Sequence, residues 1–177
     1  MTESPSTKSV TLRPLVEPDL AVLERIFTDR AQAGEFAWYG FGSTAALGRR
    51  LAEDGGLSPS GGFLGVVAGD ELAGYLTWYQ QYYGGAAGSW AWRYGMGLVP
   101  EFRDRGIGTA ATVELTRYLF ENFPADRIEG LPDAENLRSQ RMLERAGFKC
   151  EGRLRHAEFR AGRWHDLLVY SLLRSDT

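Results

Sequence analysis

The chain contains very little cysteine and lysine: Cys150 is its one cysteine, and Lys8 and Lys149 are its only lysines among 177 residues. A lone cysteine excludes an internal disulfide. No apolar run approaches the roughly 20 residues that a membrane-spanning helix needs, and the polar first eight residues lack the apolar segment of a signal peptide. We therefore expect a cytoplasmic protein with no membrane partner.

Positive charge is also in short supply, because 20 Lys and Arg face 23 Asp and Glu, which gives a net charge of −3. Nucleic-acid-binding domains need a basic surface, so this balance argues against a nucleic-acid partner. A chain of this length buries roughly 70% of its unfolded surface, which is enough for one substantial core. We expect a single domain over residues 10–177, preceded by a flexible tail over residues 1–9.

Strand-like and helix-like hydrophobic patterns alternate along the chain. Apolar residues with helical spacing occur in residues 18–33, 43–53, 108–121 and 136–146. Strand patterns occupy residues 10–15, 63–68, 72–79, 90–98, 127–131, 152–159 and 164–173. This order predicts the α/β (α+β) class, with a mixed, mostly antiparallel central sheet flanked by helices on both faces.

The junction after the fourth strand pattern favours binding of an anion. Pro100 ends the strand, Arg103 and Arg105 follow, and Gly106-x-Gly108 opens a helix. Glycines allow a phosphate to approach the backbone closely, and the free N–H groups and dipole of a helix N-terminus attract negative charge. Two glycines near an arginine also occur in ordinary strand-to-helix turns. The strings of a P-loop and of a dinucleotide-binding loop are absent, which leaves a different pyrophosphate-bearing cofactor.

Three segments, in the expected order, resemble motifs of the GCN5-related N-acetyltransferase (GNAT) superfamily. Arg103-x-x-Gly106-x-Gly108 resembles its acyl-CoA pyrophosphate loop. Residues 136–148, Asn-x-x-Ser through Gly-Phe, are similar to its second acetyl-CoA segment. Residues 151–171 resemble the branch of ribosomal-protein-alanine N-acetyltransferases, and the likeness extends over nearly the whole chain.

The resemblance implies the GNAT fold and direct transfer from acetyl-CoA, or another acyl-CoA, with no metal. The residues that it implies at the cofactor are Leu98, Val99, Arg103, Asp104, Arg105, Gly106, Ile107, Gly108, Thr109, Asn136 and Ser139.

The same resemblance implies a bulge in the strand before the pyrophosphate loop, which would free a backbone N–H for the thioester carbonyl. Gly95 and Gly97 fit such a bulge, because glycine inside a strand often marks one. Relief of crowding beside Trp90 and Trp92 is the alternative. The strand at residues 127–131 should then splay away and leave a slot for the pantetheine arm.

Acyl transfer to an amine needs a general base, and Glu158 is the residue that the resemblance implies. An amine is mostly protonated at neutral pH, so its proton must be removed before attack. A surface glutamate paired with Arg160 or Arg155 is the alternative reading of this residue. His156 and His165 are rival bases because of the usual histidine pKa.

The general acid that many superfamily members place four residues before the Gly-Phe pair is absent, since Leu143 occupies that position. Ser139, one turn earlier, matches the serine of the ribosomal-protein branch and could pass a proton to the departing sulfur. The alternative is that Ser139 makes only a helix-start hydrogen bond.

Aromatic side chains should border the acceptor, because they make good walls for a small amphipathic ligand or a peptide end. We expect the acceptor to be a primary amine of a small molecule or of a peptide or protein N-terminus, and a homodimer is compatible with the sequence. The alternative function is a non-catalytic acyl-CoA binding protein or sensor. The predicted acceptor-binding residues are Trp38, Tyr39, Phe41, Trp78, Tyr82 and Glu158. For several of the aromatic residues, Trp78 first among them, a place in the core is the alternative.

Overall fold

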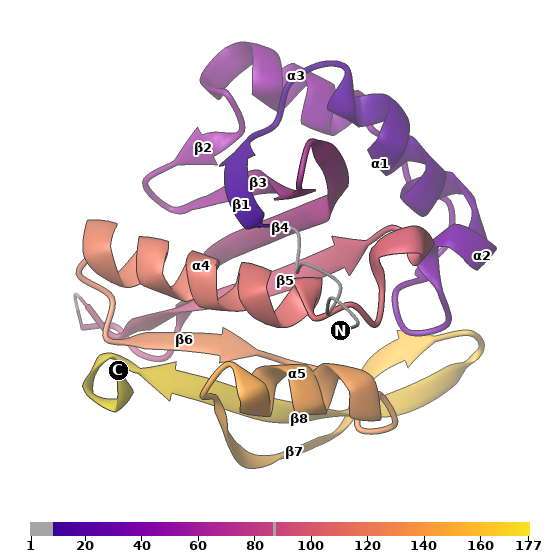
Figure 1. The fold of residues 1–177 in the computed structure, drawn as a ribbon. Helices are drawn as coiled ribbons and strands as arrows, with labels where there is room; N and C mark the ends of the chain where they lie inside the picture. The colour runs from indigo at the N-terminus through magenta and orange to yellow at the C-terminus, as the bar shows by residue number, and fades with distance from the viewer. Residues whose placement is uncertain (1–8, 87) are drawn as a thin grey trace, which may run out of the picture.

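Eight strands form one sheet in the computed structural model, which describes residues 9–86 and 88–177 (Figure 1). The strand order is β1-β3-β4-β5-β6-β8-β7, with β2 beside β3, and only β5 and β6 pair in parallel. The predicted fold class is confirmed; the expected tail lies almost wholly outside the described residues. The strands are β1 (Val10–Pro14), β2 (Leu57–Ser58), β3 (Gly61–Ala68), β4 (Glu71–Tyr82), β5 (Trp90–Leu98), β6 (Arg127–Gly130), β7 (Lys149–Arg160) and β8 (Arg163–Leu173).

The helices divide into two groups. The first three gather at the N-terminal half of the sheet, and the last two lie side by side in front of its middle and C-terminal strands (Figure 1). The five α-helices are α1 (Asp19–Thr28), α2 (Arg30–Ala33), α3 (Ala45–Asp54), α4 (Ile107–Asn122) and α5 (Leu137–Arg145), with short 3₁₀ turns at Pro100–Phe102 and Arg174–Asp176. No helix in residues 9–86 or 88–177 combines the length and apolar character needed to cross a membrane.

The helix predicted over residues 18–33 is divided in two by Asp29. This residue has an extended backbone (φ −121°), and its carboxylate accepts a hydrogen bond from the Ala31 amide at 2.8 Å. An aspartate in this position begins a new helix rather than continuing the old one, because its side chain satisfies a free N–H group. α2 is therefore a separate short helix that leads into the loop of residues 34–41.

The sheet opens between β5 and β6. β5 pairs with β4 along its whole length, whereas its parallel pairing with β6 covers only Trp92 to Tyr94. The second half of β5 therefore has no ladder on the β6 side. The slot expected at this place is confirmed.

The bulge expected in β5 is wrong for its pairing with β4, which keeps one register from Trp90 to Leu98. Glycine at position 97 is explained by packing instead, because a Cβ there would lie 2.5 Å from the Tyr75 ring. A Cβ on Gly95 would meet only the Thr77 methyl at 3.6 Å, an ordinary contact.

Candidate functional site

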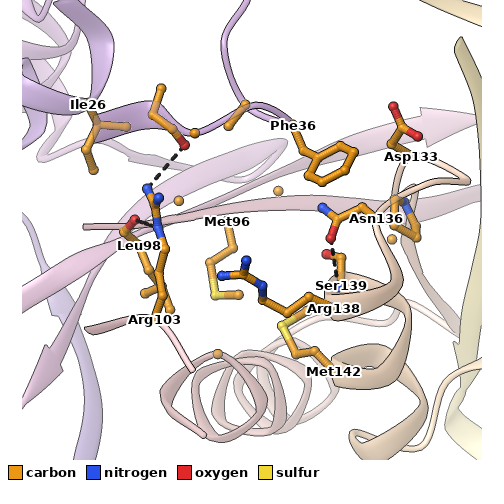
Figure 2. Close-up of a pocket in the computed structure, with 18 of the residues that line it drawn as sticks. Ile26, Phe36, Met96, Leu98, Arg103, Asp133, Asn136, Arg138, Ser139 and Met142 are labelled. Carbon is orange, nitrogen blue, oxygen red and sulfur yellow. Dashed lines mark hydrogen bonds between the residues drawn. The ribbon is translucent and has the colours of Figure 1, made fainter. Parts of the chain in front are cut away.

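One cavity of about 800 Å³ lies where β5 and β6 separate (Figure 2). Its walls come from the second half of β5, the loop and first turn of α4, the first turns of α5, residues 33–42 and Glu158 of β7. Segments far apart in sequence therefore meet around one space.

The first turn of α4 forms one end of the cavity. Gly106 precedes the helix with a left-handed backbone (φ +77°), and none of the described side chains caps this helix. The first amides of a helix have no acceptor within it, so those of Ile107, Gly108 and Thr109 are available to a ligand. A Cβ on Gly106 would meet no atom within 4 Å, so the space above the helix end is open. This end is suited to an anion.

Gly108 faces the ends of two methionine side chains. A Cβ at this position would lie 2.9 Å from the Met142 sulfur and 3.0 Å from the Met96 methyl group. Both methionines line the cavity, and Figure 2 shows Met96 below β5 and Met142 beside α5. A larger residue at position 108 would therefore displace the flexible ends of these two side chains.

The Arg103 guanidinium binds backbone carbonyls of the protein instead of facing the free amides at the start of α4. Its Nε donates to the Leu98 carbonyl at 2.9 Å, and its Nη2 donates to the carbonyls of Ala33, at 3.2 Å, and Gln32 (Figure 2). Burial lowers the pKa of its guanidinium. Arg103 lines the cavity, but its donors fix the end of α2 against β5.

Arg138 is a residue that the sequence reasoning missed. It lines the cavity from α5 and pairs with Asp104 at 3.1 Å across the open amides. Both side chains are about two-thirds exposed, 65% and 67%, and such a pair contributes little to stability. An entering phosphate could therefore replace Asp104 as its partner. The motif Asn136-x-x-Ser139 did not indicate a role for Arg138, because this residue occupies one of its unspecified positions.

Three of the predicted cofactor residues do not line the cavity: Val99, Arg105 and Ile107. Val99 is buried, and its amide already donates to the Ala73 carbonyl at 2.9 Å. Arg105 lies over the Phe102 ring at 5.9 Å, and the Ile107 side chain is buried. The predicted residues that do line the cavity are Leu98, Arg103, Asp104, Gly106, Gly108, Thr109, Asn136 and Ser139.

Asn136 and Ser139 lie together at the start of α5. The Asn136 side chain caps the helix by accepting a hydrogen bond from the Ser139 amide at 3.1 Å (Figure 2). The Ser139 hydroxyl takes no part in this bond and lines the cavity. Leu143, one turn on, is buried and also lines the wall, so the position of the missing tyrosine is filled by core packing.

Glu158 reaches the opposite end of the cavity because β7 is irregular. Leu154 pairs with Leu167 and Glu158 pairs with His165, so residues 155–157 face Asp166 alone. Such a bulge re-aims the side chains that follow it. His156, within the bulge, has a left-handed backbone (φ +49°), and its amide donates to the Asp166 carboxylate at 2.9 Å.

The Glu158 carboxylate has two neighbours. Its charge acts on the Tyr39 hydroxyl, and the Arg160 Nε lies 3.4 Å away. Although the Tyr39 ring is largely exposed, desolvation of its hydroxyl and the adjacent Glu158 charge raise the pKa of Tyr39. Tyr39 thus stays a neutral hydrogen-bond donor at neutral pH.

Arg160 joins the segments at the Glu158 end of the cavity, which we call the acceptor end. The sequence indicated Arg160 only as a surface partner of Glu158. The Arg160 side chain is 2% exposed. It binds Asp133, the Glu35 carbonyl and His165 Nδ1, and its guanidinium lies 5.4 Å from the Phe36 ring centre. The tip of the β7–β8 hairpin is thereby fixed against the loop after α2 (Figure 1).

The two rival bases lie outside the cavity. His165 is buried, with its Nδ1 2.8 Å from the Asp133 carboxylate and 3.2 Å from Arg160. His156 is exposed on the bulge. Of the three candidate bases, Glu158 is the one that lines the cavity.

Asp133, Glu135 and His165 lie near enough to each other to resemble a metal site. The cations beside them are already supplied by the protein, because Arg160 binds Asp133 and Arg163 pairs with Glu135 at 2.6 Å. This cluster fits an internal ion network better than a metal centre.

The predicted aromatic residues separate into two groups. Trp38, Tyr39 and Phe41 line the cavity, and the Trp38 and Phe41 rings meet edge to face at 5.4 Å. Trp78 is instead a core residue, 2% exposed, against Tyr118. Tyr82 is exposed and donates to Gln80.

Neither Trp78 nor Tyr82 lines the cavity, and the antiparallel pairing explains why. Tyr82 faces Trp90, at the end of β5 opposite to Leu98. The side chain of Trp78 is directed to α4. Tyr75, Thr77 and Tyr94 line the cavity without having been predicted there.

An open helix N-terminus, a slot between parting strands and a carboxylate in one cavity fit the acyl-CoA-dependent transferase that the motifs indicate. The family model described as "Acetyltransferase (GNAT) domain" matches residues 9–149. The chain therefore belongs to the GNAT acetyltransferase family, and the resemblance seen in its motifs is confirmed.

The chain is similar to a Bacillus subtilis (strain 168) protein named "Putative ribosomal N-acetyltransferase YdaF", with 37% identity over 82 residues, 46% of this chain and 45% of that protein. The match thus spans about half the length of this relative. Among solved structures, Mycobacterium smegmatis RimJ in complex with CoA-disulfide has a TM-score of 0.76 at 23% identity, covering 94% of this chain and 83% of that chain. A spermidine N-acetyltransferase from Vibrio cholerae, in complex with CoA and spermine, also has a TM-score of 0.76, at 20% identity over 94% and 96%. Both share the fold.

Proposed function

We propose that this protein transfers an acetyl group from acetyl-CoA directly to a primary amine. The observation that carries the proposal is that the uncapped start of α4 and the Glu158 carboxylate border the same cavity. An anion-binding end and a proton-accepting end in one space are what acetyl transfer from a CoA thioester to an amine requires.

Cofactor binding is assigned to the backbone and to one exchangeable arginine. The amides of Ile107, Gly108 and Thr109 would hold the pyrophosphate, and Arg138 would turn from Asp104 to a phosphate. The unpaired edge of β5 would accept the pantetheine arm, and its free N–H groups would polarise the thioester carbonyl. Cofactor roles for Leu98, Asn136 and the other predicted residues that line the cavity remain part of this proposal.

The chemical step is assigned to Glu158 and Ser139. Glu158 would accept the proton that the ammonium group loses, directly or through water, so that the nitrogen can attack the thioester carbonyl carbon. The carbon–nitrogen bond forms and the carbon–sulfur bond breaks. The nitrogen loses a second proton as the amide forms, and the Ser139 hydroxyl would relay that proton to the departing sulfur, accepting it from the nitrogen as it donates its own. The sulfur needs only modest help, because a thiol has a pKa near 8.5.

The acceptor is a small-molecule amine or the N-terminus of a peptide or protein. A ribosomal protein is suggested by the named relative, and the net charge of −3 is mildly suited to a basic partner. A cytoplasmic location belongs to the proposal, because acetyl-CoA must be supplied there. A homodimer also stays a prediction, which light scattering of the purified protein tests.

A non-catalytic acyl-CoA sensor is the competing function, and release of free thiol separates the two. A desalting column first separates a cell extract into a small-molecule fraction and a protein fraction. The protein is mixed with acetyl-CoA and each fraction in turn, and labelled acetyl-CoA in a parallel reaction identifies what becomes acetylated. We expect amine-dependent thiol release that Glu158→Gln greatly reduces. Acetyl-CoA binding without thiol release from the small-molecule or protein fraction would favour the sensor.

A further inference from the structure

We infer that the acceptor is an amine with one positive charge and an aromatic or bulky apolar group next to the amine. This inference rests on the proposed function, since it names the substrate class of the same site. It follows from the charges and the aromatic rings at the Glu158 end of the cavity.

Few carboxylates at this end are free to hold a cation. Asp133 is buried and neutralised by Arg160. Glu35 also lines the cavity but is exposed, so an ammonium group beside it would stay in contact with water. Glu158, whose side chain is 19% exposed, is the carboxylate placed inside to meet an ammonium group, and its charge acts on the Tyr39 hydroxyl.

A second buried ammonium would therefore lack a partner. Burying an unpaired charge is strongly unfavourable, and Arg160 already adds a positive charge behind the site. A polyamine or an aminoglycoside brings several ammonium groups into the acceptor site. The arrangement of charge thus selects against polycations and in favour of a monocation.

The rest of the acceptor end is aromatic. Phe36, Trp38, Tyr39 and Phe41 come from one short loop and all line the cavity. Phe41 is 87% exposed and Tyr39 is 66% exposed, which is a large apolar surface to leave in water at a cavity mouth. A ligand with an apolar body would cover these rings.

The loop is held in place before any ligand arrives. Arg160 lies against the Phe36 ring and binds the Glu35 carbonyl. Trp38 meets Phe41 edge to face. Rings fixed in this way form a rigid wall, against which a flat substituent can pack with little loss of side-chain entropy.

The test compares four amines in the thiol-release assay with saturating acetyl-CoA. These are 2-phenylethylamine, ethylamine, spermidine and a short amidated peptide beginning with phenylalanine. We expect kcat/KM for 2-phenylethylamine to exceed the values for ethylamine and spermidine at least tenfold. A peptide more active than 2-phenylethylamine would identify a peptide end as the source of the same chemistry.

Trp38→Ala should lower kcat/KM for 2-phenylethylamine at least tenfold, mainly by raising KM. The matched control is Tyr82→Ala, which removes an exposed aromatic ring outside the cavity and should change little. Spermidine as the best substrate, or equal activity of Trp38→Ala and the unchanged protein, would overturn the inference.

Calorimetry with CoA present separates this inference from the proposed function. Binding of 2-phenylethylamine that Trp38→Ala weakens, together with no thiol release from any amine, would contradict the proposed function and leave the substrate class standing. Rapid turnover of spermidine would instead support the proposed function and contradict the substrate class. No binding of 2-phenylethylamine in either protein would contradict the inference.

Discussion

The two ends of the cavity are built by different means. The cofactor end consists mainly of backbone groups in two short segments, residues 98–109 and 136–139. The acceptor end consists of side chains from three distant segments, held together by Arg160. A change of one residue should therefore act mainly on its own end, and Arg103 is the exception, because it joins segment 98–109 to the residues just before the loop of the other end.

The largest expected effect is at the acceptor end. Glu158→Gln keeps the shape of the side chain but removes the base, so kcat should fall roughly 10²-fold or more while the acetyl-CoA affinity stays within about twofold. Steady-state kinetics and calorimetry measure the two quantities. Glu151→Gln, on the same strand but outside the cavity, is the control. Near-normal turnover in Glu158→Gln at pH 7 would transfer the role to another group or to solvent.

Gly106→Val should produce the opposite pattern. The left-handed backbone at φ +77° disfavours valine, and the new side chain would enter the open space above the α4 amides. We expect the acetyl-CoA affinity to fall at least tenfold, or about 1.4 kcal/mol, by calorimetry. Gly55→Val, at φ +69° with equally open surroundings at the end of α3, controls for strain alone. An equal loss in both variants would argue against an anion site.

Arg160→Lys should weaken the acceptor end without changing the cofactor end. Lysine keeps the charge but cannot bind Asp133, Glu35 and Glu158 together, because it lacks the forked donors of arginine. The KM for the amine should rise about tenfold, kcat should change less, and the acetyl-CoA affinity should not change. Arg163→Lys, on the exposed side of the same hairpin, is the control. A fall in kcat with an unchanged KM would contradict the positioning role.

Ser139→Ala should have the smallest effect. If its hydroxyl protonates the leaving sulfur, the single-turnover rate should fall about three- to tenfold while binding changes little, the pattern of an interaction made in the transition state. The Asn136 cap should survive, because it uses the Ser139 amide. An unchanged rate would mean that the thiolate leaves without help.

The sequence predicts the cofactor end better than the acceptor end, and the physical reason is the same difference in construction. A glycine before a helix places its amides through local geometry, so the site at Gly106 follows from a short motif. The direction of the Arg103 side chain does not, because its acceptors at Gln32 and Ala33 lie about 70 residues away in the chain.

The acceptor end depends on long-range packing. The bulge at residues 155–157 decides where Glu158 points, and no local pattern announces it. Trp78 was already the aromatic residue most readily assigned to the core, whereas residue type alone did not separate Tyr82 from Trp38. The pairing of β4 with β5 separates the surface position from the cavity. The fold itself was predictable, because hydrophobic alternation fixes strands and helices locally.

The most direct test of the division between the two ends is a backbone amide NMR titration, first with CoA and then with 2-phenylethylamine. We expect CoA to shift the amides of Ile107, Gly108 and Thr109 most strongly, and the amine to shift residues 36–41 and Glu158 while leaving the first group nearly unchanged. Amides of the α4 start that ignore CoA, or a cofactor response centred on residues 36–41, would contradict this account.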